Sequence, residues 1–432
     1  MTKGHVLQIG RLAVAAAAVP LAGWLFWALG LHLGPNDFHD YWLAGKLLLE
    51  GHSPYDTGAM GTLAAREHLS FLIGGGYSYP LPFALAMLPF AALPFEVSAA
   101  VFNAVSLVAF GLTVAAWLVW AEGWAPEAAR RRMGLAFFAG LYPPIYGTVA
   151  MGQANLVLFP ALAIGVVLAL DGASPARRAT GGLLVGLAAV VKLVPGVLVV
   201  PLALGRRFGA AVGIVAAALG ALAVSIALAP WAAAGTGTLA SLFDPDAYYS
   251  NQSINGFVTR LVSASDRSEP LFSRAFDPRL AMFVLTIAFA AATLAVLWRA
   301  RAQLANRRGA ALGLALALVA GTIGAPKTSF WNESIVLVAV GLLWSVELTG
   351  SSRVDFGRGN LALLGGWFGS AVVWSVLWGL EPPAVGPLAA VVTLLWSTSL
   401  YGLLALWVLC ARRLLAVAAR LPSLMTSSGG AG

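Results

Sequence analysis

Long apolar runs separated by short basic clusters constrain this chain of 432 residues more than any other feature. A helix needs about 20 apolar residues to cross roughly 30 Å of hydrocarbon. Inside a bilayer such a helix also satisfies its own backbone hydrogen bonds. The sequence therefore predicts an all-α polytopic membrane protein, with clear runs at 12–33, 96–120, 133–150, 154–170, 208–230, 280–298, 309–324, 332–348, 361–379 and 385–410.

The scarcity of charge excludes the soluble classes. Apolar residues make up 59% of the chain and charged residues 10%, whereas soluble proteins carry about 25% charged residues. Too few charges remain to cover a water-exposed surface, so a cytosolic enzyme, a nucleic-acid-binding protein and a disordered scaffold are excluded. Membrane lipids are the expected surroundings, and nucleic acid is not an expected partner. The single cysteine, Cys410, excludes an intramolecular disulfide.

Two further runs are too short or too interrupted to be single spans. Residues 179–204 are apolar apart from Lys192, and Pro195 interrupts them, which predicts two short helices meeting there. Residues 80–93 carry three prolines in about fourteen residues. That pattern favours a short re-entrant or interfacial segment.

The basic residues set the orientation. The positive-inside rule places basic clusters in the cytoplasm, and consecutive clusters must then be separated by an even number of crossings. This predicts about twelve transmembrane helices in a single domain, 1–432, with both termini cytoplasmic. Residues 34–79 and 231–279 become long periplasmic loops. The clusters hold 18 of the 26 basic residues: Lys3/Arg11, Arg130–Arg132, Arg177/Arg178, Arg206/Arg207, Arg299/Arg301/Arg307/Arg308, Arg353/Arg358 and Arg412/Arg413/Arg420.

Asp37 and Asp40 stand at the start of the first outer loop. They are three residues apart, so one helical turn brings them to the same face, beside Tyr41. A carboxylate at the membrane boundary can deprotonate a hydroxyl group. An ordinary helix cap and polar linker is the alternative. The following stretch, 42–49, reads as an amphipathic helix in the membrane interface.

Lys192 is the sharper indication of function. An ionisable group where two short helices meet, below the membrane surface, marks a functional site by default. The non-helical backbone there requires a cavity. A lysine facing outward at that depth suits a lipid phosphate, and snorkelling to the headgroups is the alternative.

Three other outer turns carry polar groups. They contain Gln153 with Asn155, then Asn251 with Gln252 followed by Arg260, and Lys327. Arg260, Lys192 and Lys327 are predicted to converge as phosphate ligands. Loop salt bridges or interface anchors are the alternatives. The string 251–253 also matches a glycosylation sequon, a short and common motif that we discount.

Several chemistries have no motif. A Walker loop, a dinucleotide-binding glycine motif and a paired-histidine zinc motif are missing. Two carboxylates at Asp37 and Asp40 are a weak signal for a divalent cation. Neither a metal nor a cofactor is therefore expected.

The ordered outer motifs resemble glycosyltransferase family 87. They are Asp37-Phe38…Tyr41, Gly51…Pro54-Tyr55, Tyr79-Pro80-Leu81-Pro82, Gly152-Gln153-Ala154-Asn155, Lys192…Pro195, Asn251-Gln252-Ser253 and Ser329…Trp331. The resemblance covers roughly residues 12–340 and rests on the order of short motifs. It departs after Trp331, where family members often carry histidine and this chain has Asn332, Glu333 and Ser334.

The resemblance implies a bacterial inner-membrane enzyme of the GT-C fold. Such enzymes take a sugar, typically mannose, from a polyprenyl phosphate and pass it to a lipid-linked or glycan acceptor on the periplasmic face. Asp37 would be the general base of an inverting displacement. The residues expected to bind substrates are Asp40, Tyr41, Tyr79, Gln153, Asn155, Lys192, Asn251, Gln252, Arg260, Lys327, Trp331 and Glu333.

A lipid or anionic-solute transporter or flippase is the rival from another class. A transporter often shows internal repeats and polar residues at the midplane of both halves. No repeat is visible here, and the candidate polar groups fall on one predicted side. An enzyme is therefore favoured. A sugar-lipid ligase or polymerase with a diphosphate donor would differ only in its donor, which the sequence leaves open.

Overall fold

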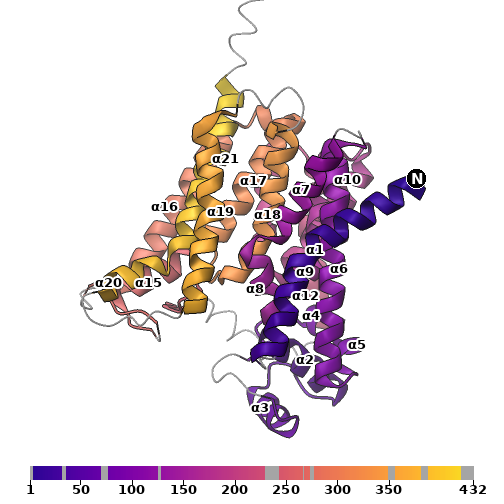
Figure 1. Cartoon of the computed structure of the whole chain (residues 1–432), viewed down its shortest axis with the longest axis vertical. Coiled ribbons are helices and arrows are strands. Elements are labelled where there is room, and N and C mark those ends of the chain that lie inside the picture. Colours follow the sequence, from indigo (N-terminus) through magenta and orange to yellow (C-terminus); the bar gives the residue numbers. More distant parts are fainter. Residues whose placement is uncertain are drawn as a thin grey trace, which may run out of the picture. The chain divides into compact units, whose positions relative to one another are not determined.

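The fold is helical throughout the part that can be described. The computed structural model describes residues 3–31, 36–69, 76–124, 128–228, 243–265, 267–272, 277–348, 356–380 and 388–419 (Figure 1). Within these ranges extended pairing is limited to two isolated bridges, Asn251 with Ser329 and Ser265 with Ser268. The predicted all-α class is confirmed. The predicted outer turn 381–383, Gly34, Pro35 and residues 231–242 lie outside the described residues.

In the described ranges, eight helical segments are long and apolar enough to cross a membrane, so the chain is a multi-pass membrane protein. They are α1 (Lys3–Leu31), α6 (Phe95–Glu122), α12 (Phe208–Ala227), α16 (Pro278–Arg299), α17 (Arg307–Gly324), the continuous segment Phe330–Glu347, α19 (Gly357–Leu380) and α21 (Thr398–Ala419). The segment Phe330–Glu347 comprises η5 (Phe330–Ile335), α18 (Val336–Leu343) and most of the π-helical turn η6 (Trp344–Leu348).

The other four predicted crossings are short or broken helices. They correspond to α7 (Ala129–Gly140) with α8 (Pro143–Met151), α9 (Asn155–Asp171), α10 (Pro175–Val191), and η2 (Val194–Leu198) with α11 (Val199–Leu204). The prediction of two short helices in 179–204 is confirmed, because helical structure is interrupted at Lys192 and Leu193.

Two predicted spans are not continuous. The prediction of one helix over 133–150 is wrong, because α7 ends at Gly140 and α8 begins at Pro143. Proline at the first helical position cannot continue a preceding helix but starts a new one well. The range 385–410 is also divided, since α20 (Ala389–Leu395) ends before α21 begins at Thr398.

The chain forms two compact units, and each is described by itself. Unit 1 comprises Met1–Ile164, Leu184–Leu193 and Ile214–Asp244. Unit 2 comprises Gly165–Leu183, Val194–Gly213 and Pro245–Gly432. Helices α9, α10 and α12 contribute residues to both units.

In unit 1, α1 packs closely along α6 and α7 (Figure 1). A Cβ atom placed at Gly111 of α6 would lie 2.6 Å from the carbonyl oxygen of Ala13. Gly140 of α7 approaches the carbonyl oxygen of Ala16 in the same way. Small residues allow this backbone approach, which is the usual means of packing helices in lipid.

A layer of short helices in unit 1 encloses α2 (Asn36–Leu49). It contains α3 (Thr57–Arg66), α4 (Leu81–Ala86) and α5 (Leu88–Ala91), and α6 also packs on α2. The Trp42 side chain is buried and its indole Nε1 donates to the Leu93 carbonyl at 3.1 Å. The neighbouring helices therefore cover most of the apolar residues of α2. The expectation that this amphipathic stretch lies in the membrane interface stays a prediction. The predicted short segment 80–93 forms α4 and α5.

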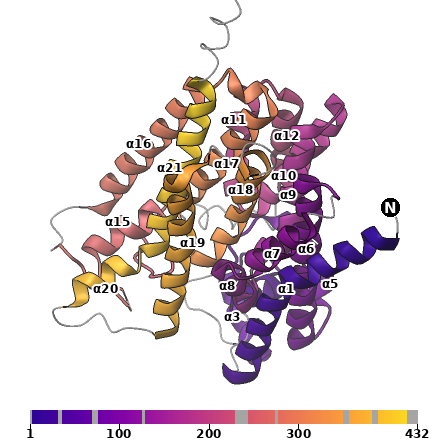
Figure 2. The same ribbon diagram turned by 45° about the horizontal axis from the view of Figure 1, so that its top comes forward.

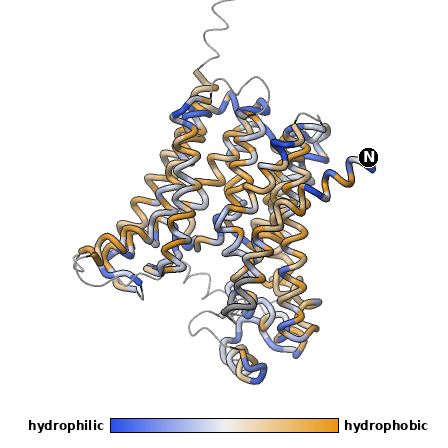
Figure 3. The backbone as a smooth tube through the Cα atoms, viewed as in Figure 1, coloured by the Kyte–Doolittle hydropathy of each residue, from blue (hydrophilic) through white to orange (hydrophobic). Residues whose placement is uncertain are grey.

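Unit 2 is built around α17, which is buried along most of its length. It packs against α16, α18 and α21, and α19 packs along α21 (Figure 2). Apolar residues of α16, which is largely orange in Figure 3, remain exposed, among them Leu280, Phe283 and Ile287. Such a face suits contact with lipid chains.

The basic end of unit 2 supports the even-crossing argument. Glu347, fully buried, forms ion pairs with Arg308 at 2.8 Å and with Arg413. Arg307 pairs with Asp171, which precedes the cluster at 177–178, at 2.9 Å. Basic clusters that are distant in sequence therefore lie at the same end of unit 2, as the predicted topology requires.

Candidate functional site

Four segments of unit 1 bring five polar side chains together. These residues, which we call the Asp37 cluster, are Asp37, Tyr41, Tyr79, Gln153 and Lys192. The Gln153 amide donates from Nε2 to Oδ2 of Asp37 and accepts at Oε1 from Lys192 Nζ at 2.8 Å. Lys192 also donates to the Tyr79 hydroxyl at 2.9 Å. The Tyr41 hydroxyl lies 2.9 Å from both the Tyr79 hydroxyl and Gln153 Oε1.

Gln153 is positioned by the end of α8. Gly152 adopts a left-handed conformation with φ of 63°, which glycine accepts without steric cost. The N–H of Gln153 donates to the Thr148 carbonyl at 2.9 Å, and the N–H of Gly152 to Val149 at 3.1 Å. This pair of bonds is a Schellman motif. The glycine therefore directs the following side chain towards Asp37.

Lys192 and Tyr79 are placed by helix boundaries. The N–H of Lys192 donates to the Ala188 carbonyl at 2.9 Å as the last turn of α10, and Pro195 cannot donate the bond that would extend the helix. Tyr79 precedes Pro80, the N-cap of α4. The Tyr55 hydroxyl donates to the Tyr79 carbonyl at 2.8 Å, which joins two of the motifs recognised in the sequence.

Burial governs the acidity of the two aspartates. It raises the pKa of Asp37 above its ordinary value, while the bond from Gln153 and the charge of Lys192 act in the opposite direction. Burial, followed by the charge of Asp37, raises the pKa of Asp40 to about 7. Asp37 and Asp40 both lie in the first half of α2, as their spacing predicts. A carboxylate with a raised pKa is a stronger proton acceptor near neutral pH.

Asn155 begins α9 two residues after Gln153, and its side chain is buried. The prediction that a helix opens at this pair of amides is confirmed. Among the described residues, no group of three or more His, Cys, Asp or Glu side chains gathers as a metal site.

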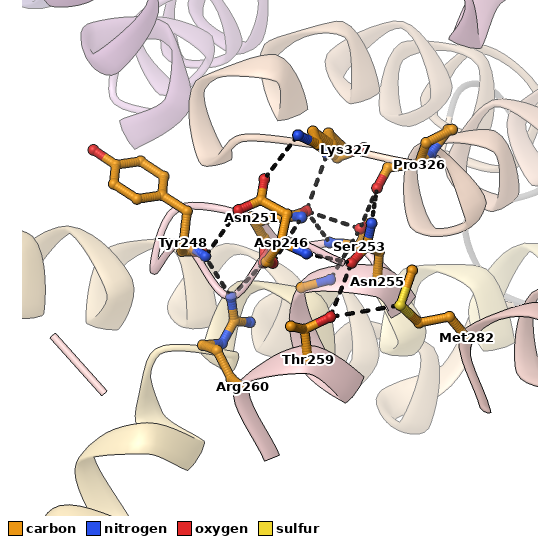
Figure 4. A network of polar contacts seen from close by, with 12 residues as sticks. Asp246, Tyr248, Asn251, Ser253, Asn255, Thr259, Arg260, Met282, Pro326 and Lys327 are labelled. Carbon is orange, nitrogen blue, oxygen red and sulfur yellow. Dashed lines mark hydrogen bonds and ion pairs between the residues drawn. The ribbon is translucent and has the colours of Figure 1, made fainter. Parts of the chain in front are cut away.

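A second polar cluster lies in unit 2, centred on Asn251 (Figure 4). The Asn251 Oδ1 atom accepts from the Ser253 hydroxyl at 2.8 Å, the Ser253 N–H at 3.2 Å and the Thr328 N–H at 3.1 Å. Its Nδ2 donates to the Asp246 carbonyl at 3.3 Å. We call this arrangement the Asn251 clamp. It fixes the loop before α15 (Ile254–Val262) to the turn after α17.

The backbone reinforces the Asn251 clamp. The N–H of Gln252 donates to the Thr328 carbonyl at 2.6 Å, and the N–H of Phe330 donates to Ser250 at 2.8 Å. The Gln252 side chain donates to the carbonyls of Tyr249, at 3.0 Å, and Trp396, at 2.7 Å. Because Asn251 and Ser253 are buried and hydrogen-bonded, the sequon at 251–253 is inaccessible to a glycosylating enzyme.

Arg260 is buried and points at the loop that carries Tyr248 and Asn251 (Figure 4). Its NH1 donates to the carbonyls of these two residues at 2.9 and 2.7 Å, and its NH2 donates to the Ser397 hydroxyl at 2.8 Å. Burial lowers the pKa of Arg260 to about 10, and the charge of Asp246 opposes that change. These contacts give Arg260 a role in ordering the loop.

The other candidates of unit 2 differ in exposure. Lys327 is 38% exposed and its Nζ lies 3.8 Å from Oδ2 of Asp246, a loose ion pair. Trp331 and Glu333 are buried in η5. The Glu333 carboxylate accepts from the Ser399 hydroxyl at 2.7 Å. The predicted convergence of Lys192 with Arg260 and Lys327 stays a prediction.

Sequence reasoning missed the partners that complete these clusters. Asp246, Ser397 and Ser399 carried no motif, and the two serines lie far along the chain from Arg260 and Glu333. Only the proximity of Asp246 to the motif at 251 was a signal that could have been used.

These observations define a polytopic helical protein in which one amide joins a partly buried carboxylate to a lysine. A family model for glycosyltransferase family 87 matches residues 77–321, more than half of the chain. The chain belongs to glycosyltransferase family 87, and it is a membrane glycosyltransferase. A search of curated proteins finds no match.

The matched range includes Tyr79, Gln153 and Lys192 but begins after Asp37. Asp37 and Tyr41 are nevertheless connected to it directly, through their hydrogen bonds to Gln153. The family match and the Asp37 cluster therefore concern the same part of unit 1.

Proposed function

We propose that the enzyme transfers a hexose, mannose, from a polyprenyl phosphate to a lipid-linked or glycan acceptor. The reaction takes place on the periplasmic face of a bacterial inner membrane, within a helical bundle of the GT-C type. The donor and the acceptor are those that the resemblance of the ordered motifs to the family implies. The observation that supports the proposal most strongly is the Asp37 cluster, in which one amide joins a carboxylate to an ammonium group.

Asp37 serves as the general base. The acceptor hydroxyl oxygen attacks the anomeric carbon of the donor sugar while the carboxylate takes the hydroxyl proton. The Gln153 amide donates a hydrogen bond to Oδ2 of Asp37, so Oδ1 of the same carboxylate is the oxygen that accepts the proton. Burial makes Asp37 more basic than an exposed aspartate by raising its pKa, which suits this role.

Lys192 stabilises the leaving group. As the bond between the anomeric carbon and the phosphate oxygen breaks, negative charge grows on the lipid phosphate, and a nearby ammonium group stabilises that charge. Its bonds to Tyr79 and Gln153 hold the ammonium in place before the substrate binds. In this proposal Arg260 orders the loop, because its guanidinium already contacts three protein oxygens, whereas the partly exposed Lys327 remains available to an anion.

A single displacement inverts the anomeric configuration, so a β-linked donor yields an α-linked product. Asp37 accepts the proton of the acceptor hydroxyl, and Lys192 stabilises the negative charge on the departing lipid phosphate. The lipid phosphate leaves with the electron pair of the broken bond to the anomeric carbon, and no further reactant is consumed.

A reconstitution experiment tests the function. The purified protein in nanodiscs is offered polyprenyl-phosphate mannose, polyprenyl-phosphate glucose and a nucleotide sugar, each with a membrane-extract acceptor. Transfer from polyprenyl-phosphate mannose alone is the expected result. Transfer from the nucleotide sugar, or movement of the intact donor lipid across the bilayer without transfer, would overturn the proposal.

A further inference from the structure

Gln153 contacts both charges of the Asp37 cluster. Its two polar atoms face in opposite directions: Nε2 towards the carboxylate of Asp37 and Oε1 towards the ammonium of Lys192. The reverse orientation would set the amide oxygen against a carboxylate and the amide nitrogen against a cation. The charges themselves therefore fix the rotamer of the amide.

Burial and neighbours reinforce that orientation. Gln153 is 6% exposed, and the Tyr41 hydroxyl lies 2.9 Å from the same Oε1 atom that accepts from Lys192. Its backbone is held by the turn at Gly152. A buried amide with this many partners has little freedom to leave them for a ligand.

We propose that Gln153 is a positioning residue for the general base: it holds Oδ2 of Asp37, aims Oδ1 at the acceptor hydroxyl, and keeps the carboxylate ionised. This inference rests on the proposed role of Asp37. It changes the role expected for Gln153, which the sequence indicated as a substrate-binding residue. It also links the cation at the donor phosphate to the base at the acceptor through one side chain.

The role of Gln153 can be measured through the pKa of Asp37. A hydrogen bond donated to a carboxylate favours its charged form, so the bond from Gln153 lowers the pKa that burial has raised. Loss of the bond must raise the pKa again. Since the base acts only when ionised, the acidic limb of the pH–rate profile should then move to higher pH.

The other ionisable groups near α2 matter because they could also affect the acidic limb of the pH–rate profile. Asp40, Tyr41 and Lys192 interact with Asp37, and Tyr79 contacts Tyr41 and Lys192. Helix α2 also carries His39, which is buried with its ring centroid 4.6 Å from that of Phe95, and Lys46, which lies over the Trp42 ring. The helices packed on α2 add few more: α4 and α5 contain none, α3 ends with Arg66, α6 begins with the exposed Glu96, and α8 contains Tyr146. Arg66 is itself paired with Glu50 and Glu67.

Two substitutions separate positioning from packing. Gln153→Met keeps the length of the side chain but can neither donate to Asp37 nor accept from Lys192. Gln153→Glu places a second carboxylate against Asp37. Both variants lose or alter the Lys192 contact, which affects donor affinity. The profile is therefore measured as kcat/KM for the acceptor at saturating donor.

The expected result is a displaced acidic limb. Gln153→Met should move the acidic limb upward by about one pH unit. At pH values well below the limb, kcat/KM should therefore fall about tenfold, whereas above the limb it should largely recover. Gln153→Glu should move the limb further. The matched control is Gln303→Met, because Gln303 is a buried glutamine outside the cluster that accepts from Asn306 Nδ2 at 2.9 Å. It should leave the limb unmoved.

The result that overturns the inference is a loss of rate in Gln153→Met that is equal at every pH, with the limb in its original place. Gln153 would then only maintain packing. Asp37→Asn, measured in parallel, tests the underlying function separately. If Asp37→Asn is inactive and the limb does not move, only the inference fails, whereas an active Asp37→Asn removes the proposed base itself.

Discussion

Replacement of Lys192 by methionine should weaken binding of the donor lipid far more than binding of the acceptor. The side chain is partly buried and is held by bonds of 2.9 Å to Tyr79 and 2.8 Å to Gln153. Two opposite unit charges about 4 Å apart interact by about 4 kcal/mol at an effective dielectric constant of about 20. The variant also avoids the cost of desolvating the ammonium. A net loss of about 2–3 kcal/mol remains, or roughly 30- to 150-fold in Kd.

The assay is equilibrium binding of a fluorescent polyprenyl-phosphate sugar to the protein in nanodiscs, repeated with the acceptor. Lys46→Met provides the matched control, because Lys46 is another partly buried lysine of unit 1, placed over the Trp42 ring at 5.5 Å from its centroid. It should leave donor affinity within about twofold. Equal donor affinity in Lys192→Met and the wild type would refute the assignment and return Lys192 to an interfacial anchor.

Three further predictions concern acidity, stability and topology. Asp40→Asn should leave the acidic limb of the rate profile nearly in place, because Asp40, whose pKa burial and the charge of Asp37 raise to about 7, is still protonated where Asp37 ionises; a clear displacement of the limb would contradict this order of ionisation. Asn251→Ala should destabilise the protein by about 2–3 kcal/mol, since the buried N–H groups of Ser253 and Thr328 lose their acceptor, and an unchanged melting temperature in detergent would disprove the clamp. Single cysteines from His52→Cys and Phe272→Cys, both at exposed positions, should react with an impermeant thiol reagent added outside intact cells, whereas Arg301→Cys should not. The native Cys410 is buried. The reverse pattern of labelling would invert the predicted topology.

Local features of this protein were accessible from the sequence. The three-residue spacing of Asp37 and Asp40 placed them together on a helix, and Pro195 located the break beside Lys192. Hydropathy found the long helices because the length that lipid requires is fixed. It failed over 133–150, where the two prolines at 143 and 144 begin a new helix inside an apolar run.

Contacts between distant segments were not accessible. Nothing in the turn at Gln153 indicates that its amide meets Asp37, 116 residues away, because that contact depends on how the helices pack. Arg260 is a second example. Its charge predicted a phosphate ligand, but the sequence did not show that it lies on the buried side of α15, where carbonyl groups of its own loop accept its hydrogen bonds.

The central claim, that Asp37 is the general base, is tested most directly by single-turnover transfer with Asp37→Asn at saturating donor. The amide is nearly isosteric with the carboxylate, but it cannot accept the proton. Removal of a general base costs typically about 10²–10⁴-fold in rate, so the account predicts a loss in that range with normal membrane insertion and unchanged donor binding. Transfer within a few-fold of the wild-type rate would contradict it.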